Sequence, residues 1–344
     1  IVLAPAFVTL NAYAGSNVSS IWYIASYMLG YLPFLLIGAR AYLDVSRIGA
    51  FVTGFALFLA FGAAAGSASR AIVIVVSRAF QAAGGGILSA CAYLWTCELV
   101  PANSPARGRL RAACHALLTT AVLAGLGLSQ IVGAAFVERG SWRWNHYVVL
   151  PFLVIPVLVT VFALEEQQRR PAAGAPSLAR RLREFDWAGS ALLTGAVVMV
   201  VTGLTFGGNE HRWDSAAPSC LIVFGVVDAG LFLAFEGLWA RRPLLRVRRW
   251  LGGFNHQLAV LSAIFLGMAT YSLFLYVPIF GIVVRHLGPI DAAVEQLAFW
   301  VPAVGTSLLC CLLAASPVFR HARRLAHWVV VPVGCALFAI GCGL

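Results

Sequence analysis

Residues 77–108 read SRAFQAAGGGILSACAYLWTCELVPANSPARG. The first part of this stretch is apolar enough to lie in a lipid bilayer, yet it contains Arg78 and, three residues later, Gln81. A charged side chain at the centre of a membrane-spanning helix costs about 2.5–3.5 kcal/mol on insertion scales. Because such a residue needs a partner or a task, we expect Arg78 to face the interior of a helical bundle.

The composition around this stretch is typical of a membrane protein. Of the 344 residues, 61% are hydrophobic and 11% are charged, whereas about 25% of the residues in soluble domains are charged. Apolar runs of about 20 residues recur, which is the length that an α-helix needs to cross the hydrocarbon core. The sequence therefore predicts an all-α polytopic membrane protein.

The expected spans follow these apolar runs, about eleven in all. They cover roughly residues 1–10, 21–38, 48–67, 71–97, 112–137, 147–164, 186–206, 218–240, 256–284, 294–316 and 326–344. The first span begins without a methionine and the last one stops with the chain, so we expect a protein that is truncated at both ends. Residues 165–184 are polar and rich in Pro, Ala and Arg, which predicts a solvated linker with a short surface helix.

The distribution of positive charge predicts the orientation of the spans. All 24 basic residues are arginines; 18 lie in the connections after the even-numbered spans and 5 in the other connections, with Arg78 inside a span. Positively charged connections remain in the cytoplasm, so the even-numbered connections are expected there. The net charge of +11 is thus explained by topology, and no nucleic-acid partner is expected.

Several motifs resemble a known family. R-x-x-Q-x-x-G-G-G at residues 78–86, followed by E-L-V-P at 98–101 and by Arg107-Gly108, resembles the major facilitator superfamily. The motifs S-W-R-W at 141–144 and D-W-A-G-S at 186–190 are similar to the fungal drug:proton antiporter branch with fourteen spanning helices. This resemblance implies a major-facilitator-like helical bundle.

The resemblance also implies a division of the chain. Residues 1–164 would be the N-terminal six-helix half with a partial first helix, and 165–185 a cytoplasmic linker. Residues 186–240 would be an extra transmembrane helix pair, and 241–344 the first three helices of an incomplete C-terminal half. Two motifs depart from the family pattern. In the connection after the second span Asp44 is kept, but Arg40 and Arg47 replace glycines, and on the fifth helix Gln130 replaces a proline.

Candidate site residues follow from helix position and from the resemblance. Arg78 and Gln81 are expected to line a substrate cavity; the alternative is a structural arginine that hydrogen-bonds to carbonyl groups or to a neighbouring helix. Further cavity candidates are Tyr27, Gln130, Tyr271 and Tyr276, for which packing is the alternative role. Gating and helix packing are expected of Asp44, Arg47, Glu98, Arg107, Gly125, Ser129 and Gly133, with topogenic charge or plain packing as the alternatives.

Asp228 lies about ten residues into the eighth span. An ionisable group at that depth is a candidate proton carrier, and a neutral or paired structural role is the alternative. Glu236 is nearer the end of the same span, where snorkelling towards Arg241 and Arg242 is expected. The glycines at 84–86 are expected to let helices approach closely.

The sequence contains none of the enzyme signatures that were sought, such as a nucleophile elbow or a phosphate-binding glycine loop. No catalytic residue, cofactor or metal site is predicted, and the eight cysteines are interpreted as small core residues. The resemblance implies proton-coupled efflux of small amphipathic organic compounds. The alternatives are a siderophore-iron type of transport and a non-transporting remnant or sensor-like membrane protein. The expected partners are a small-molecule substrate, protons and the lipid bilayer, with a monomer in the plasma membrane or in a vacuolar or other internal membrane.

Overall fold

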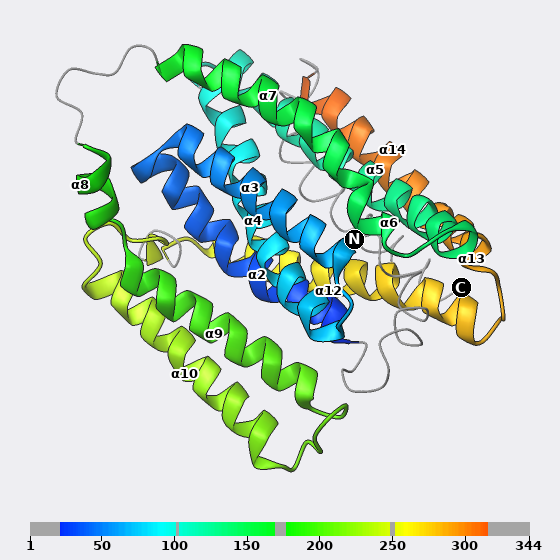
Figure 1. Cartoon of the computed structure of the whole chain (residues 1–344). Coiled ribbons are helices and arrows are strands. Elements are labelled where there is room, and N and C mark those ends of the chain that lie inside the picture. The colour runs from blue at the N-terminus through cyan, green and yellow to red at the C-terminus, as the bar shows by residue number, and fades with distance from the viewer. Residues whose placement is uncertain (1–20, 101–102, 169–176, 248–251, 316–344) are drawn as a thin grey trace. The chain divides into compact units, whose positions relative to one another are not determined.

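The computed structural model describes residues 21–100, 103–168, 177–247 and 252–315, and these ranges are mainly α-helical (Figure 1). Within them, 8 helices are long and apolar enough to cross a membrane, and Trp144–Thr160 is a shorter apolar helix. The predicted all-α membrane fold is therefore confirmed. The first and eleventh predicted spans, at 1–10 and 326–344, lie outside the described residues.

The helices follow the predicted spans closely. In chain order they are α2 (Trp22–Arg40), α3 (Arg47–Ser67), α4 (Ala71–Leu99), α5 (Pro105–Arg139), α6 (Trp144–Tyr147), α7 (Val149–Gln168), α8 (Leu178–Arg183), α9 (Trp187–Phe206), α10 (Ala216–Leu238), α12 (Phe254–Val283), α13 (Pro289–Glu295) and α14 (Leu297–Ala315). The predicted short surface helix in the linker is confirmed as α8. The sixth and tenth predicted spans are each divided between two helices, and α5 begins about two turns earlier than expected.

The connection after the second span is helical. A single π-helical turn, η1 (Ala41–Val45), continues α2. The next residue, Ser46, caps α3, because its hydroxyl accepts from the Gly49 N–H at 3.0 Å. Arg40 and Asp44 form an ion pair at 2.9 Å across this turn. Arginine in place of the family glycine thus gives Asp44 a partner on the preceding turn, and the pair favours the helical conformation.

The described chain forms two compact units. The larger one includes the residues up to Leu94 together with Leu128–Gln296, and the smaller one includes Trp95–Gly127 and the residues from Leu297 onward. These units follow spatial contacts, whereas the division predicted at residues 164, 185 and 240 follows the resemblance to a family. That division stays a prediction.

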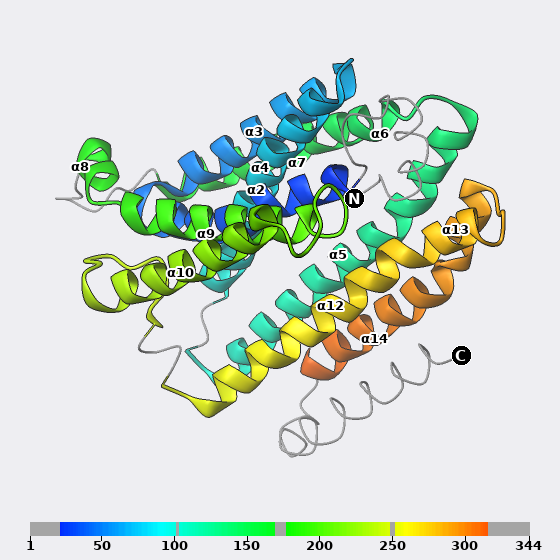
Figure 2. The same cartoon turned by 90° about the horizontal axis from the view of Figure 1, so that it is seen from below.

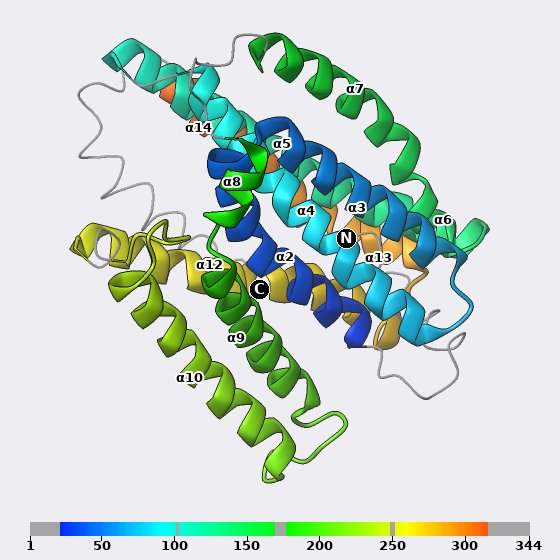
Figure 3. The same ribbon diagram turned by 60° about the vertical axis from the view of Figure 1, so that its left-hand side comes forward.

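In the larger unit, glycines bring α2, α3 and α4 into backbone contact (Figure 3). A Cβ added to Gly30 of α2 would overlap the Ala79 carbonyl of α4. On α4, a Cβ at Gly84 would lie 2.5 Å from the Gly54 carbonyl oxygen of α3, and one at Gly86 would lie 2.6 Å from the Tyr31 carbonyl oxygen of α2. The expected close approach at the triple glycine is confirmed, and it occurs on two sides of α4.

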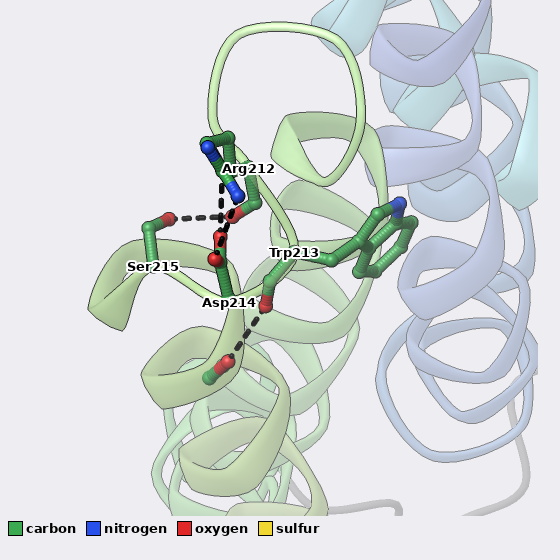
Figure 4. Close-up of polar contacts among 5 residues, drawn as sticks. Arg212, Trp213, Asp214 and Ser215 are labelled. Atoms are coloured by element: carbon green, nitrogen blue, oxygen red, sulfur yellow. Dashed lines mark hydrogen bonds and ion pairs between the residues drawn. The ribbon is translucent and has the colours of Figure 1, made fainter.

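The helices α9 and α10 pack against each other as a hairpin (Figure 1). Its turn is held by local contacts. Arg212 pairs with Asp214, as Figure 4 shows. The Ser219 hydroxyl donates to the Trp213 carbonyl at 3.3 Å. The Trp213 ring covers Gly207, and the adjacent Gly208 has a φ of 77°, a conformation that favours glycine. The helix α8 lies at the opposite end of the hairpin (Figure 2).

The hairpin is attached to α2 near both of its ends. Near the turn, the Trp22 Nε1–H donates to Glu210 Oε1 at 2.7 Å, and the Trp22 ring meets Phe206 edge-on at 5.5 Å. At the other end, the buried residues Phe185, Phe232 and Leu244 form an apolar cluster against Ile37, Ala41 and Val45. The hairpin is therefore packed along the length of α2.

In the smaller unit, the first part of α5 packs against α14. The Thr120 and Ser307 hydroxyls are 2.8 Å apart, and the Cys311 thiol donates to the Ala113 carbonyl at 3.3 Å. A Cβ at Gly127 would lie 2.9 Å from Cβ of Trp300. Small and weakly polar residues thus form this contact, as is common between membrane helices.

We expect Gly30→Ala to destabilise the protein by about 1–3 kcal/mol, because the added methyl group forces α2 and α4 apart. Thermal unfolding of the purified protein in detergent micelles measures the effect. The matched control is Gly230→Ala on α10, where an added Cβ would meet nothing within 4 Å. Equal unfolding temperatures for the two variants would contradict the role of Gly30.

Candidate functional site

Arg78 is buried inside the larger unit, with 5% of its surface exposed. Its Nε donates a hydrogen bond to the Tyr23 carbonyl oxygen of α2 at 2.6 Å. The guanidinium carbon lies 5.6 Å from the centroid of the Tyr27 ring, in the geometry of a cation–π contact. The expected inward position of Arg78 is confirmed. A bond to a carbonyl group is also what a structural arginine makes, so the binding role of Arg78 stays a prediction.

A row of aromatic and hydroxyl groups continues from Arg78 along α2 and α4. The Tyr27 and Tyr31 rings stack with their centroids 5.9 Å apart, and the Tyr31 hydroxyl donates to Ser89 Oγ at 3.1 Å. Gly85 leaves room for the Tyr27 hydroxyl, which would lie 3.1 Å from a Cβ at that position. Sequence reasoning missed Tyr31, although its position four residues after Tyr27 places both on one helix face.

Gln81 does not share this environment with Arg78. It is 6% exposed, and its Nε2 would lie 2.9 Å from a Cβ on Gly62, so its side chain packs against α3. Arg78 instead contacts α2. The structure thus separates two residues that were expected to line one cavity, because three residues along a helix correspond to a rotation of about 60° away from the starting direction.

The two tyrosines of α12 differ in their surroundings. Tyr271 is 54% exposed, and its ring meets the Phe274 ring edge-on with the centroids 6.4 Å apart. Tyr276 is 63% exposed, and five residues of helix turn it about 140° away from Tyr271. The cavity role of Tyr271 and of Tyr276 stays a prediction.

Gln130 was expected to line the cavity, and the structure gives it a different contact. It is completely buried, and its Nε2 donates to the Phe274 carbonyl oxygen of α12 at 3.4 Å. Pro278 is the residue four positions after Phe274, and a proline has no N–H to give to that carbonyl. Gln296, also buried, donates to the same oxygen at 3.0 Å. Gln130 and Gln296 therefore replace the helical hydrogen bond that Pro278 removes.

The predicted gating and packing residues are dispersed over both units. Asp44 pairs with Arg40, Arg47 is exposed at the start of α3, and Arg107 is exposed and donates to Asn103 Oδ1 at 3.4 Å. Glu98 lies near the end of α4, and its expected pairing across the gate stays a prediction.

The glycine motif on α5 is only partly packed. Gly133 is buried and Ser129 is half-buried, whereas a Cβ at Gly125 would meet nothing within 4 Å in the described part of the chain. The expected close packing at Gly125 is therefore not found, and Gly127 takes that place by lying against Trp300. The sequence pattern identified the correct helix, but the contact is made two residues farther along the chain.

Asp228 is half-buried on α10 and points at α9, where a Cβ on Gly195 would lie 2.6 Å from its Oδ2. Its place inside the hairpin agrees with the expected depth, and its role as a proton carrier stays a prediction. Glu236 does not snorkel to the surface as expected. It is 4% exposed, and its Oε2 accepts a hydrogen bond from the Leu245 N–H at 3.2 Å.

The fold and these contacts define a multi-pass integral membrane protein with a buried arginine beside an aromatic row. A sequence comparison agrees: the family model described as Major Facilitator Superfamily matches residues 1–344. The chain belongs to this superfamily.

Curated relatives are found among fungal proteins. The chain is 26% identical over 345 residues to the MFS-type efflux pump LUC4 of a Fusarium species. The matched region covers 100% of this chain and 58% of the relative. It is likewise 26% identical over 345 residues to the efflux pump FUS6 of Gibberella fujikuroi, with 100% and 59% covered. The acurin A biosynthesis cluster MFS-type transporter of Aspergillus aculeatus is 26% identical over 343 residues, with 100% and 59% covered. The chain thus spans less than two thirds of the length of these relatives.

We expect Gln130→Leu to lower the free energy of unfolding by about 1–3 kcal/mol, because it withdraws a donor from a buried carbonyl. In a Pro278→Ala background, Gln130→Leu should destabilise the protein less, because the introduced alanine supplies an N–H to the Phe274 carbonyl within the helix. A double-mutant cycle on unfolding in mixed micelles measures this coupling, which is expected to be about 0.5–3 kcal/mol.

The control for this cycle is Pro302→Ala, which removes the proline inside α14. It should not alter the effect of Gln130→Leu. Strictly additive effects of Gln130→Leu and Pro278→Ala would show that the Gln130 amide does not substitute for the N–H that Pro278 lacks.

Proposed function

We propose that the protein is a secondary active transporter that exports small amphipathic organic compounds in exchange for protons. The observation that carries the proposal is the row at the α2–α4 contact, where the Arg78 guanidinium is followed by the stacked rings of Tyr27 and Tyr31. The names of the relatives from Fusarium, Gibberella and Aspergillus, two efflux pumps and a transporter of a biosynthesis cluster, support efflux as the direction.

The chemistry of the row suits an amphipathic compound. The tyrosine rings offer flat apolar surface, and aromatic contacts of this kind contribute about 0.5–1.5 kcal/mol beyond the area that they bury. The Ser89 and Tyr31 hydroxyls and the guanidinium offer hydrogen bonds to the polar part of such a compound. Planar or aromatic substrates that carry oxygen acceptors are therefore favoured over sugars.

The contacts of Arg78 support a role in ligand binding, because a ligand group can take the place of one of them. Within the described ranges, no carboxylate pairs with Arg78, and its contacts are a carbonyl oxygen and an aromatic ring. A charged hydrogen bond is stronger when the acceptor is itself charged. An anionic or strongly polar substrate group can therefore compete with the Tyr23 carbonyl for the guanidinium without breaking an ion pair.

Proton coupling requires a carboxyl group that changes protonation during transport. Asp228 is the proposed carrier, because it lies within the α9–α10 hairpin and faces α9. An ionisable residue inside a membrane-spanning helix is expensive to keep and is a functional candidate for that reason. The alternative is a purely structural role within the hairpin, and the Asp228→Asn variant distinguishes the two roles.

We expect Arg78→Ala to lower the rate of efflux by about 10–100-fold, which corresponds to the loss of a charge-assisted hydrogen bond of about 1.5–3 kcal/mol. The measurement is efflux of a fluorescent amphipathic compound from cells that express the full-length protein, at matched membrane abundance. The control is Arg212→Ala, because the Arg212 side chain is 87% exposed in the outer turn and should be dispensable. Full efflux with Arg78→Ala would refute the site. Iron-chelate uptake in place of efflux would indicate siderophore-iron transport.

Asp228→Asn is expected to leave the protein folded and to uncouple efflux from an imposed pH gradient. The measurement is the rate of transport in proteoliposomes with and without the gradient. The gradient does not accelerate transport by a carrier that cannot bind and release a proton. The matched control is Asp291→Asn at the exposed start of α13, which should respond to the gradient as the wild type does. A normal response from Asp228→Asn would assign the residue a structural role.

A further inference from the structure

Two carboxyl groups meet at the end of the α9–α10 hairpin that lies opposite the 207–215 turn. Asp186 is the N-cap residue of α9, and its Oδ1 accepts from the Gly189 N–H at 2.8 Å. Glu236 lies in the last turn of α10, and its Oε2 accepts from the Leu245 N–H at 3.2 Å. One oxygen of each carboxyl group is therefore held by the backbone.

The other two oxygens, Asp186 Oδ2 and Glu236 Oε1, are buried without a hydrogen-bond donor among the described residues. They point at the same small space: a Cβ on Gly189 would lie 2.6 Å from Asp186 Oδ2 and 2.5 Å from Glu236 Oε1. Because both oxygens lie next to the same point, the two carboxyl groups face each other across this space. Two acceptors at this distance form a hydrogen bond only if one of them carries a proton.

The surroundings offer the pair little other compensation. Phe185, next to Asp186, and Phe232, one helical turn before Glu236, belong with Leu244 to a buried apolar cluster. Glu236 is itself more than nine-tenths buried, so water does not screen its charge. An uncompensated buried charge is costly, and two like charges in one site raise that cost further.

The charged groups of the packed elements are engaged elsewhere. Arg242 pairs with Glu184 at 2.5 Å, and Arg180 donates to the same carboxylate at 2.8 Å. The hydrogen bond from Arg180, together with the charge of Arg242, holds the pKa of Glu184 below its usual value. Arg181 donates to the Val45 carbonyl at 3.1 Å, and Arg40 pairs with Asp44 on η1. Among the described arginines of α8 and of the connector, the other three, Arg183, Arg241 and Arg246, are exposed.

We propose that Asp186 and Glu236 form a proton-binding site in which one proton is shared between Asp186 Oδ2 and Glu236 Oε1. The proton comes from the aqueous phase and returns to it, with no change in covalent bonds or redox state. The bound form carries one negative charge in place of two. The absence of a side chain at Gly189 is what leaves the space for this hydrogen bond.

The site connects three segments of the chain. Asp186 begins α9, Glu236 ends α10, and the Leu245 N–H belongs to the connector that leads towards α12. With the proton bound, the three are joined by hydrogen bonds, and without it two carboxylates repel each other at the point of contact. The attachment of this end of the hairpin thus depends on proton binding. The site is more than two helical turns from Asp228 and does not rest on the proposed transport function.

Infrared spectroscopy of the full-length protein in detergent micelles tests the site, since a protonated carboxyl group gives a C=O stretching band separate from that of a carboxylate. We expect a band that disappears on titration to alkaline pH in the wild type. Glu236→Gln and Asp186→Asn should each remove it, because an amide then donates to the remaining carboxylate at every pH. Asp214→Asn is the matched control, since its carboxyl group is exposed and paired with Arg212, and it should leave the band unchanged.

Thermal unfolding as a function of pH gives a second readout. The folded wild type holds a proton that the unfolded chain releases, so its melting temperature should fall as the pH rises. Both amide variants should lose this part of the dependence, and Asp214→Asn should keep it. A band and a pH dependence that persist in both variants would overturn the proposal. So would a melting temperature that depends at constant pH on replacing Na⁺ with choline, because the pair would then bind a metal cation.

Discussion

The close crossing of α2 and α4 is the contact on which the candidate site depends. Gly30 and Gly86 let the two backbones touch, and this brings the Tyr23 carbonyl within 2.6 Å of the Arg78 Nε. A guanidinium inside an apolar bundle is tolerated only when its donors find acceptors. With larger residues at the crossing, Arg78 would lose both this carbonyl and the Tyr27 ring, so the small residues are a condition for keeping the charge.

At two other places in the larger unit, a polar group likewise fits where a neighbouring helix lacks an atom. At Pro278 the missing N–H leaves the Phe274 carbonyl without its helical donor, and the buried amides of Gln130 and Gln296 supply one. At Gly189 the missing side chain leaves a space into which Asp186 and Glu236 direct one oxygen each. In each case an absent atom on one helix determines where a polar group on another helix can be placed.

The features that were predicted correctly are those that a single helix determines. The length of each apolar run gave the spans, the position of Arg78 in such a run implied burial, and the triple glycine implied close neighbours. A single helix does not determine which neighbour a side chain meets. Gln81 faces α3, Gln130 donates to the Phe274 carbonyl of α12, and a Cβ at Gly125 would meet nothing within 4 Å in the described part of the chain. Periodicity gives the face on which a residue lies but not the element that covers that face.

The amino-acid sequence alone determined that this is a helical membrane protein of the major facilitator type, with an arginine buried in its fourth span. Hydrophobic length, charge placement and local motifs suffice for that, because each acts within one helix or one connection. Only the tertiary structure decided the partners: Tyr31 beside Tyr27, Gln130 on the Phe274 carbonyl, and Glu236 against Asp186. These contacts join residues that are far apart along the chain, or they depend on how each helix is rotated about its own axis. The packing of neighbouring helices determines both the pairing and the rotation.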